Sequence, residues 1–290
     1  MSGHREAIKA KKSLGQNFLT DRRIVRRIVE AVAPQASDVI IEIGPGTGAL
    51  TTMLVERAGY VTAIEIDPRL AVEIRALIAA ENFSLVEADA LSVNWPALLD
   101  DACAAWERLH SQEEASPRVR VVANLPYYIS TPILQTLLQH HDRLHDMTLM
   151  LQDEVVERIT SSPGGREYGY LSVLTQYYCE AAKLFEVPPS AFKPAPKVWS
   201  AIVKLTVRDR PPVAVTDEEK FFALIRAAFA QRRKTIANNL KAAEPALGFA
   251  EEVAIALERA GIDARRRAET LSLADFANLY RALYGQDQVA

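Results

Sequence analysis

Short apolar runs alternate with longer helical patterns from residue 37 to residue 161, and this alternation restricts the fold more than any other feature. The apolar runs predict buried strands over Val39–Ile43, Val61–Ile64, Leu85–Val86 with its flanks, Val119–Ala123 and Met147–Leu151. The intervening segments predict helices over Leu50–Ala58, Pro68–Ala80, Pro132–His140 and Asp153–Ser161. Strands that alternate with helices in this way form parallel sheets with crossover helices, so we expect an α/β fold.

The pattern changes after residue 183. Two strand candidates, Leu184–Val187 and Ala201–Val207, are too close together for a helical crossover and predict an antiparallel end to the sheet. A linker with two prolines, Arg208–Thr216, precedes a region that shows only helical periodicity. We therefore expect a basic N-terminal segment, an α/β domain and a small all-helical C-terminal domain, over residues 1–20, 21–210 and 211–290.

Composition excludes several classes of protein. No apolar stretch approaches membrane-spanning length and no cleavable leader is evident, so we expect a cytoplasmic protein without a membrane partner. The two cysteines lack metal-type spacing, and His141 and His145 lack a third ligand, so we expect no metal. We also expect a monomer.

Basic residues are clustered although the net charge is −3. Through residue 27 there are eight basic residues against two acids, and residues 221–243 contain five basic residues and no acid. Such clusters bind phosphates even on a mildly acidic protein, although most charge runs are only solvated faces.

The segment Glu42–Gly48 follows the first predicted strand and contains three glycines. Glycines at a strand-to-helix turn let a ligand approach the backbone, so Gly44 and Gly46 are candidate ligand contacts. The same turn also fits a dinucleotide fingerprint, which leaves an NAD-dependent oxidoreductase as an alternative.

Acids follow the next two strands, and an unusual tetrapeptide follows the fourth. Glu65 is placed to accept hydrogen bonds from ribose hydroxyls, and Asp89 from the exocyclic amine of adenine. Asn124-Leu125-Pro126-Tyr127 can grip a flat, amine-bearing ring, although Asn and Pro are also common turn residues. S-adenosylmethionine explains all of these features together, whereas NAD explains only the turn and Glu65.

The chain resembles the ribosomal RNA adenine N6-dimethyltransferases, most closely the bacterial small-subunit type. The matching segments are Leu14–Leu19, Glu42–Gly48, Glu65, Asp89, Asn124–Ser130, Phe192–Val198, Gln231–Lys234 and Asn238–Leu240. The resemblance spans about residue 11 to at least residue 280 and implies a Rossmann-like class I S-adenosylmethionine-dependent methyltransferase sheet. It implies cofactor contacts at Asn17, Leu19, Gly44, Glu65, Asp89 and Asn124. It also implies that two adjacent adenosines near the 3′ end of 16S rRNA, in the small (30S) subunit, each receive two methyl groups.

The same resemblance suggests a role for each residue of the tetrapeptide. Asn124 and the Leu125 carbonyl would accept the two hydrogens of the adenine amine, and Pro126 would fix the direction of that carbonyl. Tyr127 and Phe192 would stack on opposite faces of a flipped base. The candidates for phosphate contact are Lys11, Lys12, Arg22, Arg23, Lys193, Lys197, Arg232, Arg233 and Lys234.

Two further alternatives remain open at this point. The first is a large-subunit (23S) RNA methyltransferase of the macrolide-resistance type, which often has Phe at the position of Tyr127 and a different C-terminal basic segment. The second is a ribosome-assembly or RNA-binding factor that keeps a methyltransferase shell without turnover. The segment Asp100–Pro117 is longer than expected for the family, and its role is open.

Overall fold

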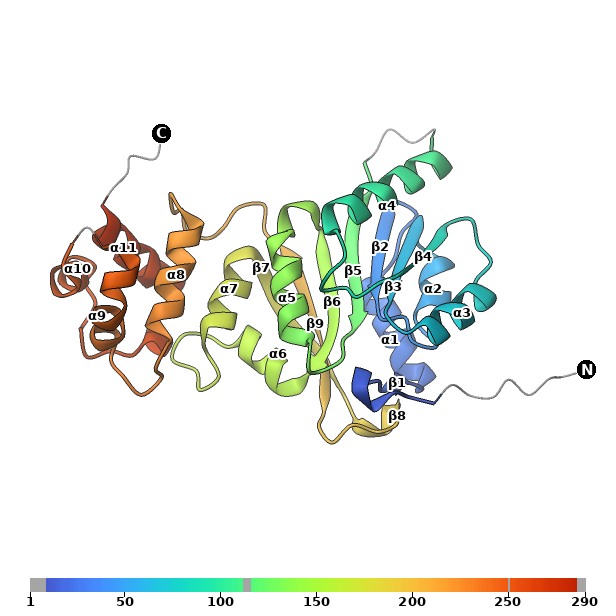
Figure 1. Ribbon diagram of the computed structural model, residues 1–290, viewed down its shortest axis with the longest axis horizontal. Coiled ribbons are helices and arrows are strands. Elements are labelled where there is room, and N and C mark those ends of the chain that lie inside the picture. The colour runs from blue at the N-terminus through green and yellow to red at the C-terminus, as the bar shows by residue number, and fades with distance from the viewer. Residues whose placement is uncertain (1–8, 112–115, 250, 286–290) are drawn as a thin grey trace, which may run out of the picture. The chain divides into compact units, whose positions relative to one another are not determined.

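The computed structural model describes residues 9–111, 116–249 and 251–285, so parts of the three predicted domains and of the segment 100–117 lie outside the described residues. Within these ranges a seven-stranded sheet confirms the expected α/β fold (Figure 1). Its strand order is β4-β3-β2-β5-β6-β9-β7. The strands are β2 Asp38–Ile43, β3 Tyr60–Glu65, β4 Phe83–Glu87, β5 Arg118–Asn124, β6 Asp146–Gln152, β7 Cys179–Val187 and β9 Ser200–Val207.

The five strands predicted from the apolar runs pair in parallel, and the antiparallel end of the sheet is also confirmed. Strand β2 pairs in parallel with β3 on one side and β5 on the other, and β6 pairs antiparallel with β9. The chain order reverses direction across the sheet at β2 and β5. Ligands bind beyond the carboxyl ends of strands at such a switch point, which is where the glycine turn and Asn124 lie.

Helices connect the strands, and three of them begin at a capping side chain. Asp21, Asp67 and Asn94 cap α1, α3 and α4, because each side-chain oxygen accepts a hydrogen bond from a first-turn N–H. The segment Asp100–Pro117 begins inside α4, because the cap at Asn94 starts this helix at Trp95. The α-helices between residues 22 and 160 are α1 Arg22–Val32, α2 Thr51–Val55, α3 Pro68–Leu77, α4 Trp95–Leu109, α5 Ser130–Gln139 and α6 Asp153–Thr160.

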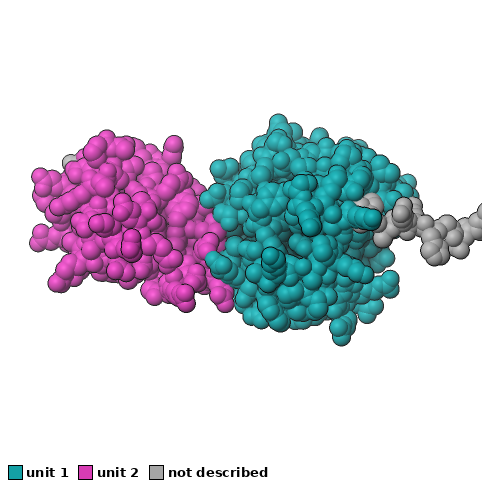
Figure 2. All heavy atoms as spheres, turned by 60° about the horizontal axis from the view of Figure 1, so that its bottom comes forward, with its two compact units in different colours: residues 1–156, 182–207 teal, residues 157–181, 208–290 magenta. Residues whose placement is uncertain are grey.

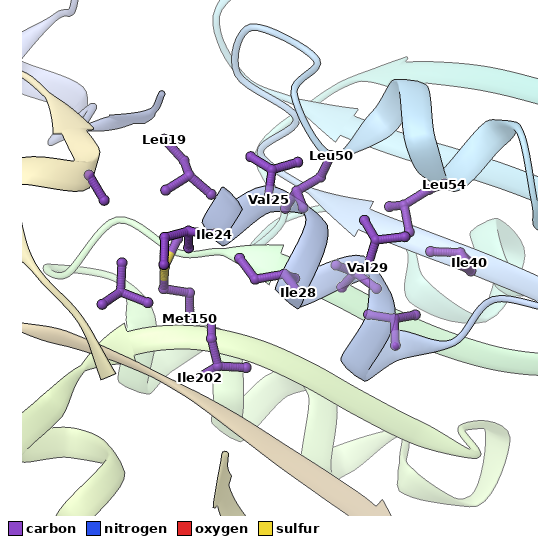
Figure 3. Close-up of a cluster of buried hydrophobic side chains, with 14 of the residues drawn as sticks. Leu19, Ile24, Val25, Ile28, Val29, Ile40, Leu50, Leu54, Met150 and Ile202 are labelled. Atoms are coloured by element: carbon purple, nitrogen blue, oxygen red, sulfur yellow. The ribbon is translucent and has the colours of Figure 1, made fainter. Parts of the chain in front are cut away.

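Helix α1 packs its apolar face onto the sheet (Figure 3). Its buried residues Ile24, Val25, Ile28 and Val29 are spaced at three and four positions, which places them on one face of the helix. They join a cluster with Ile40 of β2 and other residues of β6 and β9. The opposite face of α1 carries exposed arginines.

A buried ion network joins three strands at their amino ends. The Arg120 guanidinium of β5 contacts Asp38 of β2 at 2.8 Å and Asp146 of β6 at 2.9 Å. It also donates to the carbonyl of Val32 at the end of α1, so its donors are satisfied at several points. This network lies at the opposite edge of the sheet from the glycine turn and Asn124.

A small ribbon between Phe18–Leu19 (β1) and Phe192–Lys193 (β8) was not predicted. The two antiparallel strands pair Leu19 with Phe192 and Phe18 with Lys193. A short 3-10 helix, Lys12–Leu14, precedes β1. The ribbon therefore brings the N-terminal segment beside Phe192 and Lys193, which lie far away in the sequence.

The chain divides into two compact units (Figure 2). Unit 1 comprises residues 1–156 and 182–207, and unit 2 comprises residues 157–181 and 208–290. The helices of the second unit are α7 Tyr170–Tyr178, α8 Glu218–Ala228, α9 Ile236–Leu247, α10 Val253–Arg259 and α11 Leu273–Tyr284. Among the described helices, none has the length and apolar character that a membrane crossing requires.

Candidate active site

A cavity of about 350 Å³ opens at the carboxyl edge of the sheet in unit 1. This volume lies in the range of small-molecule sites. Its walls come from the N-terminal segment, the glycine turn, the ends of β3, β4 and β5, and β8. It brings together all of the predicted cofactor and catalytic residues, namely Asn17, Leu19, Gly44, Gly46, Glu65, Asp89, Asn124, Leu125, Pro126, Tyr127 and Phe192.

The glycine turn exposes its backbone to the cavity. Gly44 and Gly46 have φ angles of +69° and +59°, a region that side chains other than glycine rarely adopt. The Gly44 N–H donates to the Ile64 carbonyl at 2.9 Å, which ties the turn to the end of β3. A side chain at either position would strain the turn and remove the close backbone approach that a ligand needs.

Glu65 ends β3 and lies almost fully buried against this turn. Its carboxylate accepts hydrogen bonds from the Asp67 N–H at 2.9 Å and the Gly46 N–H at 3.3 Å. Burial is the main cause of a raised pKa for this carboxyl, and the two N–H groups act in the opposite direction. The carboxylate is therefore oriented by the backbone and lines the cavity where it can accept further hydrogen bonds.

Glu42 is a second acid of the cavity wall that the sequence analysis did not single out as a site residue. It lies in the middle of the sheet, and burial raises the pKa of its carboxyl to about 8, with the charge of Glu65 adding to the effect. Among the described residues, no hydrogen-bond partner faces its buried Oε2 atom. The sequence did contain a sign that Glu42 is unusual, because it is the one charged residue in the apolar run Val39–Ile43.

Asp89 and two apolar side chains form another part of the cavity lining. The Asp89 Oδ1 atom accepts the Leu91 N–H at 2.9 Å, so the turn after β4 holds the carboxylate in place. Ile66 and Leu91 also line the cavity and are partly exposed. Apolar walls around one carboxylate suit a flat ring that carries an amine.

The amide of Asn124 is oriented by the N-terminal segment. Its Nδ2 atom donates to the Asn17 carbonyl at 3.3 Å, and the Asn17 amide donates to the Gly15 carbonyl at 3.1 Å. The Nδ2 side is thereby engaged, and Oδ1 is the atom of this amide that can accept a hydrogen bond from a ligand. Asn17 thus acts on the site through its backbone, which explains why composition gave no signal for it.

The rings of Tyr127 and Phe192 both line the cavity but are held in different ways. The Tyr127 hydroxyl shares a 2.8 Å hydrogen bond with Ser200 Oγ at the start of β9. Burial raises the pKa of this hydroxyl. Phe192 is almost fully buried and is placed by its backbone pairing with Leu19. The N–H of Leu125 donates to the Met150 carbonyl at 3.2 Å, which fixes the peptide between Asn124 and Leu125.

The basic candidates differ in their surroundings. Lys11 forms an ion pair with Asp67 at 3.0 Å, and the exposed Arg23 forms one with Asp21 at 3.2 Å. The side chains of Lys12, Arg22, Lys193 and Lys197 are also exposed. In unit 2, Arg232, Arg233 and Lys234 are exposed on the turn between α8 and α9. The buried Asn239 donates to the Ala228 and Gln231 carbonyls, which holds this turn in shape. Phosphate contact by any of these residues stays a prediction.

Comparison with known proteins identifies the family. The model of the ribosomal RNA adenine dimethylase family matches residues 7–284. The chain belongs to this family. The match covers the cavity, the tetrapeptide after β5 and most of unit 2, and it excludes the oxidoreductase alternative.

Curated relatives support the membership over nearly the whole chain. The ribosomal RNA small subunit methyltransferase A of Moorella thermoacetica is 48% identical over 94% of this chain and 92% of its own. The protein of the same name from Saccharophagus degradans is 42% identical over 98% and 97%.

Two solved structures share the fold. A dimethyladenosine transferase from Plasmodium falciparum has a TM-score of 0.72 and 26% identity, with 90% of this chain and 95% of that chain covered. The 23S rRNA methyltransferase ErmE has a TM-score of 0.67 and 28% identity, with 92% and 99% covered. The expected class I methyltransferase fold is confirmed.

Proposed function

We propose that this protein dimethylates N6 of two adjacent adenosines in the loop of the 3′-terminal hairpin of 16S rRNA, within the small ribosomal subunit. The observation that carries the proposal is the oriented Asn124 amide, which lines a cofactor-sized cavity together with Tyr127 and Phe192. The names of the curated relatives favour the small subunit over the large-subunit alternative. A role in ribosome biogenesis follows from such a substrate.

The cavity fits S-adenosylmethionine as the cofactor. Glu65 would accept hydrogen bonds from the ribose hydroxyls, and Asp89 from the adenine amine, between the apolar walls Ile66 and Leu91. The open backbone at Gly44 and Gly46 leaves room for the amino-acid part of the cofactor. When bound, the cofactor supplies a methyl group on a sulfonium, which is a good leaving group.

The residues of the tetrapeptide would prepare the adenine amine for attack. Its lone pair is conjugated into the ring, and hydrogen bonds to Asn124 Oδ1 and the Leu125 carbonyl favour a tetrahedral nitrogen. Tyr127 and Phe192 would hold the ring in line with the methyl group. Positioning of this kind lowers a barrier by several kcal/mol without a dedicated base. The proton leaves after transfer, when the nitrogen is strongly acidic.

The wider surface would hold the RNA. A target base must leave any stack, so a single-stranded loop is the expected substrate. The exposed Lys193 and Lys197, which follow the cavity residue Phe192 in the chain, would contact phosphates, and so would the exposed basic turn of the helical residues 211–290. We also propose that the protein works as a monomer, because a single chain contains all of the proposed cofactor and catalytic residues. A ribosomal substrate also supports our proposal that the protein works in the cytoplasm.

Methylation of purified subunits tests the proposal directly. Small ribosomal subunits that lack the modification are incubated with the protein and methyl-labelled S-adenosylmethionine, and the labelled nucleotides are mapped. We expect dimethyladenosine at two adjacent positions near the 3′ end of the RNA. Label confined to large-subunit RNA would favour the alternative, and no label on either subunit would contradict both.

The Glu65→Ala variant is expected to bind S-adenosylhomocysteine about 10- to 100-fold more weakly, because a charged acceptor for the ribose is lost. Calorimetric titration measures the change. Glu87→Ala is the matched control, since Glu87 is the register partner of Glu65 on β4 but does not line the cavity. Equal affinities for Glu65→Ala and the wild type would refute the ribose-binding role.

A further inference from the structure

The seven residues 193–199, here named the rim segment, connect two residues of the site. Phe192 precedes the segment and lines the cavity, and Ser200 follows it and binds the Tyr127 hydroxyl at 2.8 Å. Both anchor residues are buried, whereas six of the seven residues between them are exposed. The rim segment is therefore fixed at both ends beside the base-binding rings and open to solvent along its length.

Two large aromatic rings are exposed at this edge of the sheet. Trp199, the last residue of the rim segment, is 51% exposed, and Tyr128, which lines the cavity next to Tyr127, is 58% exposed. These are the two aromatic residues among the exposed large hydrophobic side chains of the described ranges. Tyr and Trp side chains are enriched at binding interfaces, because each combines a large apolar ring with a polar group.

The sheet register places Trp199 near the target base. Asn124 pairs with Met150, and Gln152, two residues further along β6, pairs with Ser200. Two strand spacings and two residue rises separate the backbones of Asn124 and Ser200, which amounts to roughly 10–12 Å. The Trp199 carbonyl accepts the N–H of Asp153 at 3.0 Å, so the backbone at this position is also fixed.

We propose that Trp199 is a stacking surface for a base that flanks the methylated adenosine in the RNA. The inference rests on the proposed function and extends it to the neighbouring nucleotides. Lys193 and Lys197 on the same segment are exposed cations that suit the phosphates on either side of a stacked base. The seven residues of the rim segment therefore offer a single-stranded RNA an aromatic ring for one base and two positive charges for its phosphates.

The tryptophans of this chain allow a direct optical test. Of the three, Trp95 and Trp106 are 3% and 1% exposed, so Trp199 is the indole that external molecules reach. A dye-labelled, adenine-rich single-stranded oligoribonucleotide is titrated in, its binding is followed by anisotropy, and tryptophan emission is recorded in parallel. We expect saturating RNA to quench emission and to protect it from iodide. Unchanged emission and unchanged iodide quenching at saturation would refute the inference.

Kinetics on small subunits separate this inference from the proposed function. Trp199→Leu, which keeps an apolar side chain without a ring, should raise KM for the subunit about tenfold. Trp199→Leu should leave the affinity for S-adenosylhomocysteine unchanged. Trp199→Phe, which keeps an aromatic ring, should have a KM close to that of the wild type. Val72→Ala, at an exposed apolar position of α3, is the control.

The outcomes are distinguishable. A wild-type protein that does not methylate the subunit would refute the proposed function itself. An active wild type with an unchanged KM in Trp199→Leu would refute the stacking role alone. A raised KM in Trp199→Leu without any RNA effect on tryptophan emission would also refute it, and would point to a ribosomal protein at this surface.

Discussion

Replacing Asn124 with alanine is expected to lower the rate of methyl transfer by about 100- to 1,000-fold, because the amine loses an acceptor that is oriented before the substrate binds. The orientation comes from the Asn17 carbonyl, which accepts from Nδ2 and directs Oδ1 as the acceptor for a ligand. Single-turnover transfer of labelled methyl groups to small subunits measures the rate.

The same variant should retain most of its affinity for S-adenosylhomocysteine, since Glu65, Asp89 and the glycine turn are untouched. Asn278→Ala, an exposed asparagine of α11 that is distant in sequence from the cavity residues, is the control for the substitution itself. A normal transfer rate in Asn124→Ala would remove the proposed role of the amide. Equal losses of transfer and of cofactor affinity would assign Asn124 to cofactor binding instead.

The sequence predicted the sheet well because four of its strands, β2, β3, β5 and β6, are buried on both faces. Runs such as Val119–Ala123, in which Arg120 is the one charge, are mostly apolar, and their order along the chain leaves few arrangements of a parallel sheet. The glycine turn and Glu65 were also predictable, since polar and flexible residues directly follow these runs. The residues that follow each apolar run therefore predicted part of the cavity lining.

The ribbon of β1 and β8 was beyond this kind of reasoning. Each of its strands has two residues, which is too short to show a period of two. Phe192 entered the predicted site only through the family resemblance, and the pairing with Leu19 explains how it reaches the cavity. Contacts between segments this far apart depend on the assembled core and not on any local pattern.

Glu42 illustrates the same limit for charge. The sequence places one acid in an apolar strand, but its protonation state depends on how deeply the folded sheet buries it. Burial raises the pKa of this carboxyl to about 8, whereas in an unfolded chain its pKa is about 4.3. Below pH 4 the carboxyl is protonated in both states, so it adds no pH dependence there.

Between pH 4.5 and 8 the folded state holds a proton that the unfolded state has released, so the free energy of unfolding should fall as the pH rises. Each pH unit in this window costs about 1.4 kcal/mol, and the loss ends above the folded pKa of about 8. Glu42→Gln removes this proton linkage. Its stability relative to the wild type should therefore increase by about 4 kcal/mol from pH 5 to pH 8.

Urea denaturation followed by tryptophan emission measures this difference in the relevant part of the molecule, because all three tryptophans lie in unit 1. Glu81→Gln, the same change at an exposed position before β4, serves as the matched control. A constant stability difference between Glu42→Gln and the wild type over this pH range would mean that Glu42 is ionised in the folded protein. In that case the acid would face the cofactor cavity as a fixed negative charge, and Gln should then weaken binding of the cationic cofactor more than binding of neutral S-adenosylhomocysteine.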